Sequence, residues 1–191
     1  MIPYGRQSIS KDDIAAVEAV LRSDYLTQGP VGPRFERSVA ARVGAAHAVA
    51  VNSATSALHI ACAALDLGPG DLLWTSPNTF VASANCGRYC GADVDFVDID
   101  PETFNICPDA LAAKLGTAAR AGRMPKVIVA VHMCGQSPDM ARIATLARAH
   151  GVRIIEDASH SIGADYLDAP VGGCAHSDIT VFSFHPVKII T

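Results

Sequence analysis

The chain has 191 residues, of which 50% are hydrophobic and 18% are charged, and its formal net charge at pH 7 is −4. This weakly acidic balance and the lack of any stretch rich in lysine and arginine argue against a nucleic-acid partner. The apolar runs are strand-sized, far short of the roughly 18 residues that a membrane-spanning helix needs, and residues 1–13 lack the apolar core of a signal peptide. We therefore expect a cytoplasmic protein without a membrane segment.

The N-terminal part of the chain predicts two helices separated by a loop. A capping-box pattern followed by apolar periodicity predicts a helix over residues 11–23. Residues 25–33 are rich in glycine and proline and are predicted to form the loop. The second helix is predicted over residues 34–43, and Gly44 ends it.

From residue 46 onward, predicted strands alternate with predicted helices. The strands are predicted at residues 46–52, 71–76, 93–99, 126–131, 153–157 and 178–184, and the helices at residues 55–67, 79–89, 108–121 and 139–150. This alternation is typical of a mostly parallel sheet with helices on both faces, which is a three-layer α/β architecture. Ligands of such sheets bind at the carboxyl ends of the strands, so the residues that follow each strand are the candidates for a site.

Two of these strand ends suit a flat, phosphorylated ligand. Small and hydroxyl residues follow the first predicted strand and open a helix, and a helix N-terminus with its unpaired N–H groups can bind a phosphate; they include Ala54, Thr55 and Ser56. An ordinary serine or threonine helix cap is the alternative. Phe80 follows the second predicted strand and could stack on a planar ring, although an aromatic there is also a common core residue.

The last two strand ends carry ionisable groups. Asp157 ends a buried strand and needs a partner, such as an N–H group on a ligand, a helix N-terminus or a loop cation. His160 lies three residues further on and could donate a hydrogen bond or simply be exposed. Ser183 and Lys188 follow the final strand, and Lys188 is either a reactive amine or a lysine that extends to solvent.

Taken together, these strand ends match one cofactor better than they match separate structural roles. Pyridoxal 5′-phosphate (PLP) has a phosphate, a flat ring, a pyridine nitrogen and an aldehyde, and each has a candidate partner here. The six cysteines form no CxxC pair, so we expect reduced thiols and no metal site. An α/β binding domain without a cofactor is the competing interpretation.

Several motifs, in order, resemble the sugar aminotransferases of the DegT/DnrJ/EryC1/StrS family. They are LTQGP, NSATSAL, SPNTFVAS, EDASHSIGA and FSFHPVK, and the resemblance extends from residue 2 to residue 191. It implies the large domain of the aspartate-aminotransferase architecture, known as fold type I. Within the family, IPYGRQ, SATSALH and SFHPVKIIT most resemble the transaminases of pseudaminic acid biosynthesis.

The resemblance implies a role for each candidate residue. Lys188 forms the Schiff base with PLP, Asp157 pairs with the pyridine nitrogen, and His160 lies near the phenolic oxygen, where many members have glutamine. Phe80 is the ring-stacking aromatic, and the phosphate is bound by Ala54, Thr55, Ser56 and Ser183. Further candidates for the sugar site are Tyr4, Thr27, Gln28, Gly29 and His185.

The resemblance also implies an activity and partners. An amino group moves from an amino acid, by resemblance glutamate, to the C4 ketone of a UDP-linked 4-keto-6-deoxy-N-acetylhexosamine, in a pathway that modifies cell-surface polysaccharide or flagellin. Family members are homodimers that share their active sites between subunits. A PLP-dependent nucleotide-sugar dehydratase and a non-catalytic regulatory protein of the same fold are the alternatives. The dehydratases have histidine in place of the lysine, so Lys188 disfavours them.

Length sets one further expectation. Members of this family are about twice as long, so we expect residues 1–191 to be the N-terminal part of the PLP-binding large domain. The rest of that domain and a small C-terminal domain would be missing. A polypeptide of only these residues is then expected to be inactive.

Overall fold

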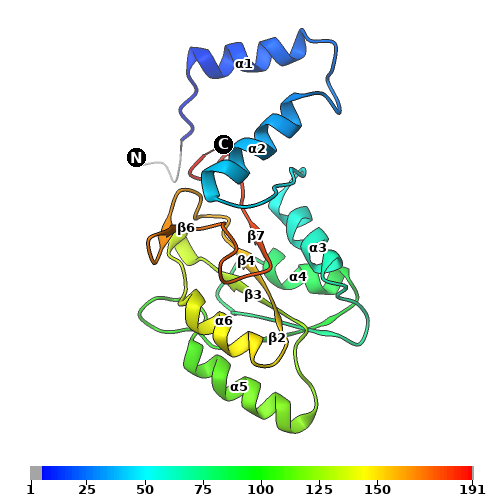
Figure 1. Ribbon diagram of the computed structural model, residues 1–191, viewed down its shortest axis with the longest axis vertical. Helices are drawn as coiled ribbons and strands as arrows, with labels where there is room; N and C mark the ends of the chain where they lie inside the picture. The colour runs from blue at the N-terminus through cyan, green and yellow to red at the C-terminus, as the bar shows by residue number, and fades with distance from the viewer. Residues whose placement is uncertain (1–5, 191) are drawn as a thin grey trace.

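The computed structural model describes residues 6–190 and contains a five-stranded, wholly parallel sheet in the order β2-β1-β3-β4-β7 (Figure 1). Helices separate the first four of its strands along the chain, as the alternation predicted. The strands are β1 (Leu72–Thr75), β2 (Asp93–Phe96), β3 (Val127–Val131), β4 (Arg153–Asp157) and β7 (Ile179–Val181).

Helices cover both faces of this sheet, which confirms the predicted three-layer α/β class (Figure 1). Helices α3 (Ala54–Ala64) and α4 (Ala82–Tyr89) pack on one face, and α5 (Pro108–Ala121) and α6 (Met140–Arg148) pack on the other. All five residues of β3 are buried because helices lie above and below it. None of the helices within residues 6–190 is long and apolar enough to cross a membrane.

The two acidic residues that end β4 point to opposite faces of the sheet, since side chains alternate along a strand. Asp157 faces the α4 side, where Ser83 contacts it. Glu156 faces the other side, where it forms a buried pair with His132. The chain therefore separates two adjacent carboxylates into two distinct environments.

The N-terminal helices stand at one end of the molecule, at the top of Figure 1. Helix α1 (Lys11–Leu21) begins with the predicted capping box and has no buried residue. Helix α2 (Val31–Val43) ends at the predicted Gly44, whose φ of +72° suits glycine, but it begins three residues earlier than predicted. Pro33 is tolerated in its first turn because N–H groups there have no intrahelical acceptor.

The predicted strand at residues 46–52 is wrong. Its apolar alternation is real, but within residues 6–190 no strand pairs with it, and Val49 is 79% exposed. A strand needs a neighbour for its N–H and C=O groups. Here the Ala50 N–H donates instead to the Glu36 carboxylate of α2, at 2.9 Å.

Three short elements went unpredicted. Strands β5 (Asp165–Tyr166) and β6 (Ala169–Pro170) form a two-residue hairpin, and η1 (Met133–Gly135) is a single 3₁₀ turn after β3. The hairpin turn places Leu167 and Asp168 at φ values of +49° and +60°. Such turns usually contain glycine or asparagine, whereas this turn has leucine and aspartate.

Candidate active site

Asp157 is the last residue of β4 and is only 5% exposed. The Ser83 hydroxyl donates to its Oδ2 at 2.6 Å, and the Ser159 hydroxyl donates to its Oδ1 at 2.6 Å. The Ser159 N–H also donates to Oδ1, at 3.3 Å. A buried carboxylate is costly unless hydrogen bonds satisfy it, and these bonds both satisfy Asp157 and fix its orientation.

Ser83 is a site residue that the sequence reasoning missed. It is fully buried on α4, and its Oγ lies 2.8 Å from the Thr79 Oγ1 as well as 2.6 Å from Asp157. The two hydroxyl residues are four positions apart, which places them on one side of this segment. That spacing beside a strand end was the available signal, although it is common in proteins.

Lys188 and His160 are brought together although 28 residues separate them. The Lys188 Nζ lies 2.7 Å from the His160 Nε2, within hydrogen-bond distance, and both side chains are half-buried. A tight turn positions the lysine, since its N–H donates to the His185 carbonyl at 2.8 Å. Burial lowers the pKa of His160 below its usual 6.5, the Lys188 charge lowers it further, and the Asp157 carboxylate opposes both effects.

The segment after β7 carries Lys188 to the same edge as Asp157. Val181 of β7 lies directly beside Asp157 in the sheet register. The Ser183 side chain is buried and accepts a hydrogen bond from the His185 N–H at 3.4 Å. Lys188 and Asp157 therefore belong to one region, as the rule about strand ends predicted.

The first turn of α3 opens at the same side of the sheet, where β7 ends (Figure 1). Its cap is Ser53, whose Oγ accepts from the Ser56 N–H at 3.1 Å and donates to the Ser56 Oγ at 3.1 Å. The alternative of a serine cap is thus realised, but at Ser53. Ala54, Thr55 and Ser56 are half-buried in that turn, close to its remaining free N–H groups.

The other candidate residues are less closely tied to this region. Phe80 lies in the turn between β1 and α4 and is 73% exposed, and His185 is also exposed. Thr27, Gln28 and Gly29 lie in the loop between α1 and α2, and no hydrogen bond or ion pair within residues 6–190 joins them to Lys188, Asp157 or His160. Tyr4 lies outside the described residues.

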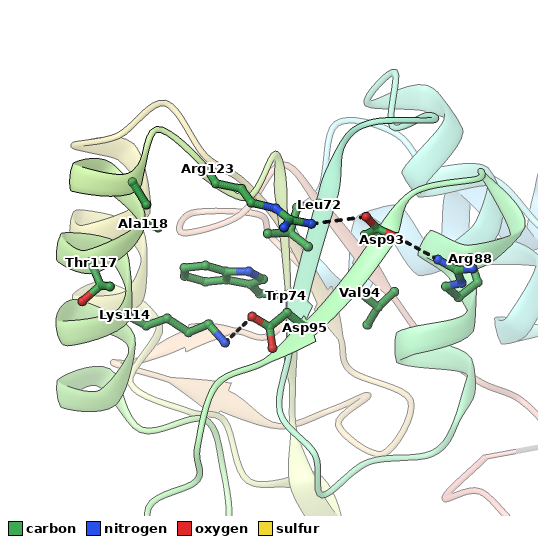
Figure 2. Close-up of a pocket in the computed structure, with 11 residues that line it drawn as sticks. Leu72, Trp74, Arg88, Asp93, Val94, Asp95, Lys114, Thr117, Ala118 and Arg123 are labelled. Atoms are coloured by element: carbon green, nitrogen blue, oxygen red, sulfur yellow. Dashed lines mark hydrogen bonds and ion pairs between the residues drawn. The ribbon is translucent and has the colours of Figure 1, made fainter.

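A cavity of about 670 Å³ lies elsewhere, between α5 and the edge strand β2 (Figure 2). Trp74 forms its floor, and its charged residues are paired with one another. Lys114 lies 2.7 Å from Asp95, and Arg123 lies 3.3 Å from Asp93. Its cations are already matched by carboxylates, so we place the candidate active site at the strand ends.

The chain belongs to the DegT/DnrJ/EryC1/StrS aminotransferase family, whose sequence profile matches residues 7–191. The spore coat polysaccharide biosynthesis protein SpsC of Bacillus subtilis (strain 168) is 42% identical over 187 residues, which cover 98% of this chain and 46% of SpsC. The chain therefore spans about half the length of this curated relative.

Solved structures of other proteins have the same fold. PseC of Helicobacter pylori, an aminotransferase of pseudaminic acid biosynthesis, is 33% identical with a TM-score of 0.90; the match covers 99% of this chain and 49% of PseC. Spr1654 of Streptococcus pneumoniae in its PLP form is 29% identical with a TM-score of 0.88; the match covers 100% of this chain and 50% of Spr1654. These similarities confirm the fold type I architecture.

Proposed function

We propose that the full-length polypeptide that carries this chain is a PLP-dependent nucleotide-sugar transaminase. It would move an amino group from glutamate to the C4 ketone of a UDP-linked 4-keto-6-deoxy-N-acetylhexosamine. The observation that carries the proposal is the half-buried amine of Lys188, hydrogen-bonded to His160 at the edge of the sheet where Asp157 is buried. The similarity to PseC supports the sugar class.

The donor set at this edge fits PLP. The free N–H groups and hydroxyls of the first turn of α3 suit a phosphate, and Lys188 supplies an amine for the aldehyde. Asp157 is a fixed acceptor for the protonated ring nitrogen, and Phe80 has an exposed ring that could stack. When bound, PLP supplies an electron sink that stabilises a carbanion at the carbon carrying the amino group.

Individual residues of the chain would then have separate roles in holding the cofactor, moving the proton and contacting the sugar. Ser83 and Ser159 hold Asp157 still, so that the carboxylate meets the ring N–H without reorganising. The Lys188 amine would take the proton from the Cα of the amino-acid donor and, in the second half-reaction, would give a proton to C4 of the sugar. His185 and the loop at Thr27, Gln28 and Gly29 are proposed to contact the sugar.

We also propose how this chain relates to the whole protein. Residues 1–191 would form the N-terminal part of the PLP-binding domain, because the matched relatives are about twice as long. The protein would be a homodimer with shared active sites, and the exposed apolar side chains of α1 and α2, such as Val17 and Phe35, are consistent with further covering surfaces. We expect it to act in the cytoplasm.

The substrate assignment is tested by incubating the full-length protein with glutamate and a panel of 4-keto nucleotide sugars. We expect 2-oxoglutarate and a 4-amino sugar to form in equal amounts with the UDP-linked 6-deoxy-N-acetylhexosamine. Lys188→Ala should abolish turnover, since no other amine in the site can move the proton. Equal turnover of sugars that lack the N-acetyl group, or amino transfer to a different carbon, would contradict the assignment.

A further inference from the structure

We propose that His160 is a positioning residue that aims the Lys188 amine at the cofactor aldehyde. The neutral imidazole would hold the lysine nitrogen through the hydrogen bond between Nζ and Nε2. This inference rests on the proposed function and gives His160 a role toward Lys188, in addition to the predicted proximity to the phenolic oxygen of PLP.

Chemistry decides donor and acceptor once Lys188 is charged. An ammonium can only donate, so at 2.7 Å the Nε2 of a neutral His160 accepts, and the ring proton of that imidazole is then on Nδ1. A lysine side chain has several rotatable bonds and considerable rotamer entropy. One short hydrogen bond at its end restricts the nitrogen to a small volume before the aldehyde arrives, which is how pre-organisation accelerates a bond-forming step.

The turn that carries His160 is itself tightly held. Gly135 of η1 has a φ of +94°, and a Cβ added there would lie 2.9 Å from the His160 carbonyl oxygen. The backbones of η1 and the turn therefore touch at a point where only glycine fits. On its other side the turn is fixed by the Ser159 bonds to Asp157 and by the Ser161 N–H, which donates to the Ala158 carbonyl at 2.8 Å.

The charges around His160 keep it in the form that this role requires. A protonated imidazole could not accept from Lys188 and would place a second positive charge beside the ammonium. Burial and the Lys188 charge lower the pKa of His160, and the Asp157 carboxylate only partly offsets them. His160 is therefore neutral at pH 7, and its positioning role is lost only in more acidic solution.

Attachment of the PLP aldehyde to Lys188 requires no net transfer of a proton to or from His160. The Lys188 ammonium would first lose one proton to solvent. The lone pair of the neutral nitrogen would then form a bond to the aldehyde carbon of PLP as the carbon–oxygen double bond breaks. The oxygen leaves as water with the two protons that the amine nitrogen held. His160 orients the nitrogen while Nζ still has a hydrogen to donate, so its effect is on the rate of attachment.

The contact can be tested without the cofactor, by following the histidine ring signals of cofactor-free protein through a pH titration with NMR. We expect His160 to titrate below its ordinary value in the wild type. In Lys188→Met its pKa should rise, because the neighbouring positive charge is gone, yet stay below 6.5 because burial persists. An unchanged pKa in Lys188→Met would overturn the proposed pair.

The positioning role is tested by the rate at which PLP attaches covalently to Lys188, followed by absorbance across pH. His160→Leu should attach PLP about tenfold more slowly or worse, the usual scale for losing a hydrogen bond to a charged group. His160→Gln offers an acceptor that does not titrate, so it should restore most of the rate at pH 8. The exposed His150, which lies just after α6, gives the matched control His150→Gln, which should behave as the wild type.

The pH dependence of the PLP attachment rate distinguishes a positioning role of His160 from a role in packing alone. In the wild type the rate should fall steadily with acidity, because less amine is neutral, and more steeply below the pKa of His160. His160→Gln should lose that second decline. If His160→Leu, shown to be folded by circular dichroism, attaches PLP at the wild-type rate, the inference is wrong. If the wild type attaches no PLP at all, the proposed function is wrong instead.

Discussion

Ser83 is the residue whose importance depends most on three-dimensional context. Removing its hydroxyl leaves the Asp157 Oδ2, a buried charged oxygen, without its partner. We expect Ser83→Ala to lower the free energy of unfolding by about 1–3 kcal/mol and to weaken PLP binding, because Asp157 then turns toward Ser159. Urea unfolding and PLP titration measure the two effects.

An exposed serine on another helix provides the control for this change. Ser38 of α2 donates to the Arg34 carbonyl at 2.9 Å, and it has no charged partner among residues 6–190. Ser38→Ala should change the free energy of unfolding by less than about 0.5 kcal/mol. Equal losses in the two variants would show that Ser83 is an ordinary helix serine with no special relation to Asp157.

Single residues at strand ends could be predicted from the sequence, whereas their partners could not. Asp157 and Lys188 stood out because each follows an apolar, β-branched run in a chain that alternates strands and helices. Ser83 did not, since one serine on the buried face of a helix resembles any other. The contact between Lys188 and His160 joins residues 28 positions apart, and no local pattern encodes it.

At the scale of elements, helices and strands with a clear local sequence pattern were predicted correctly. The prediction failed where a strand would also need a neighbouring strand to pair with. The helix at residues 108–121 and the strand at residues 153–157 were predicted with the bounds that the structure has. The predicted strand at 46–52 has strand periodicity, yet its backbone groups find no ladder within the described residues. Periodicity describes which side chains face a core, and a strand also requires a neighbour.

The contact between η1 and the turn after β4 is the element-scale feature that supports the site. Gly135→Ala would place a Cβ 2.9 Å from the His160 carbonyl oxygen and would also force alanine into a φ of +94°. We expect a loss of more than about 1 kcal/mol in the free energy of unfolding, since the native conformation is incompatible with the new side chain. The pKa of His160 should also move, because the turn shifts.

Gly122, which follows the last residue of α5, provides a control that distinguishes backbone strain from a steric clash. Its φ is +66°, and a Cβ there would meet nothing within 4 Å. Gly122→Ala therefore measures the backbone strain alone, about 1 kcal/mol. A loss in Gly135→Ala no larger than this control, with an unchanged titration of His160, would mean that η1 does not hold the turn.

For the whole molecule, the sheet separates a site on one face from a buried, hydrogen-bonded Glu156–His132 pair on the other. Glu156 accepts from His132 at 2.8 Å and from the hydroxyls of Ser177 and Thr180. Burial raises the pKa of Glu156, but these hydrogen bonds outweigh it and bring the pKa below its usual 4.5. Removing His132 would leave a buried carboxylate oxygen without this partner, which typically costs about 1–3 kcal/mol or more.

This pair predicts how global stability depends on acidity. The folded pKa of Glu156 is depressed, so the stabilisation by its carboxylate is fully present above pH 4.5 and is lost as the pH falls through the folded value. Glu156→Gln should unfold more easily at pH 7 and lose stability less steeply below pH 4.5 than the wild type. Parallel acid profiles, measured by urea unfolding at each pH, would contradict this role.

The central claim concerns one amine, and the most direct measurement is to locate the attached cofactor. The full-length protein is incubated with PLP, reduced with borohydride, digested and analysed by mass spectrometry. We predict that the added mass lies on the peptide that contains Lys188 and disappears in Lys188→Ala. Label on Lys114 or Lys126 in place of Lys188, or no label on the folded protein, would contradict the account.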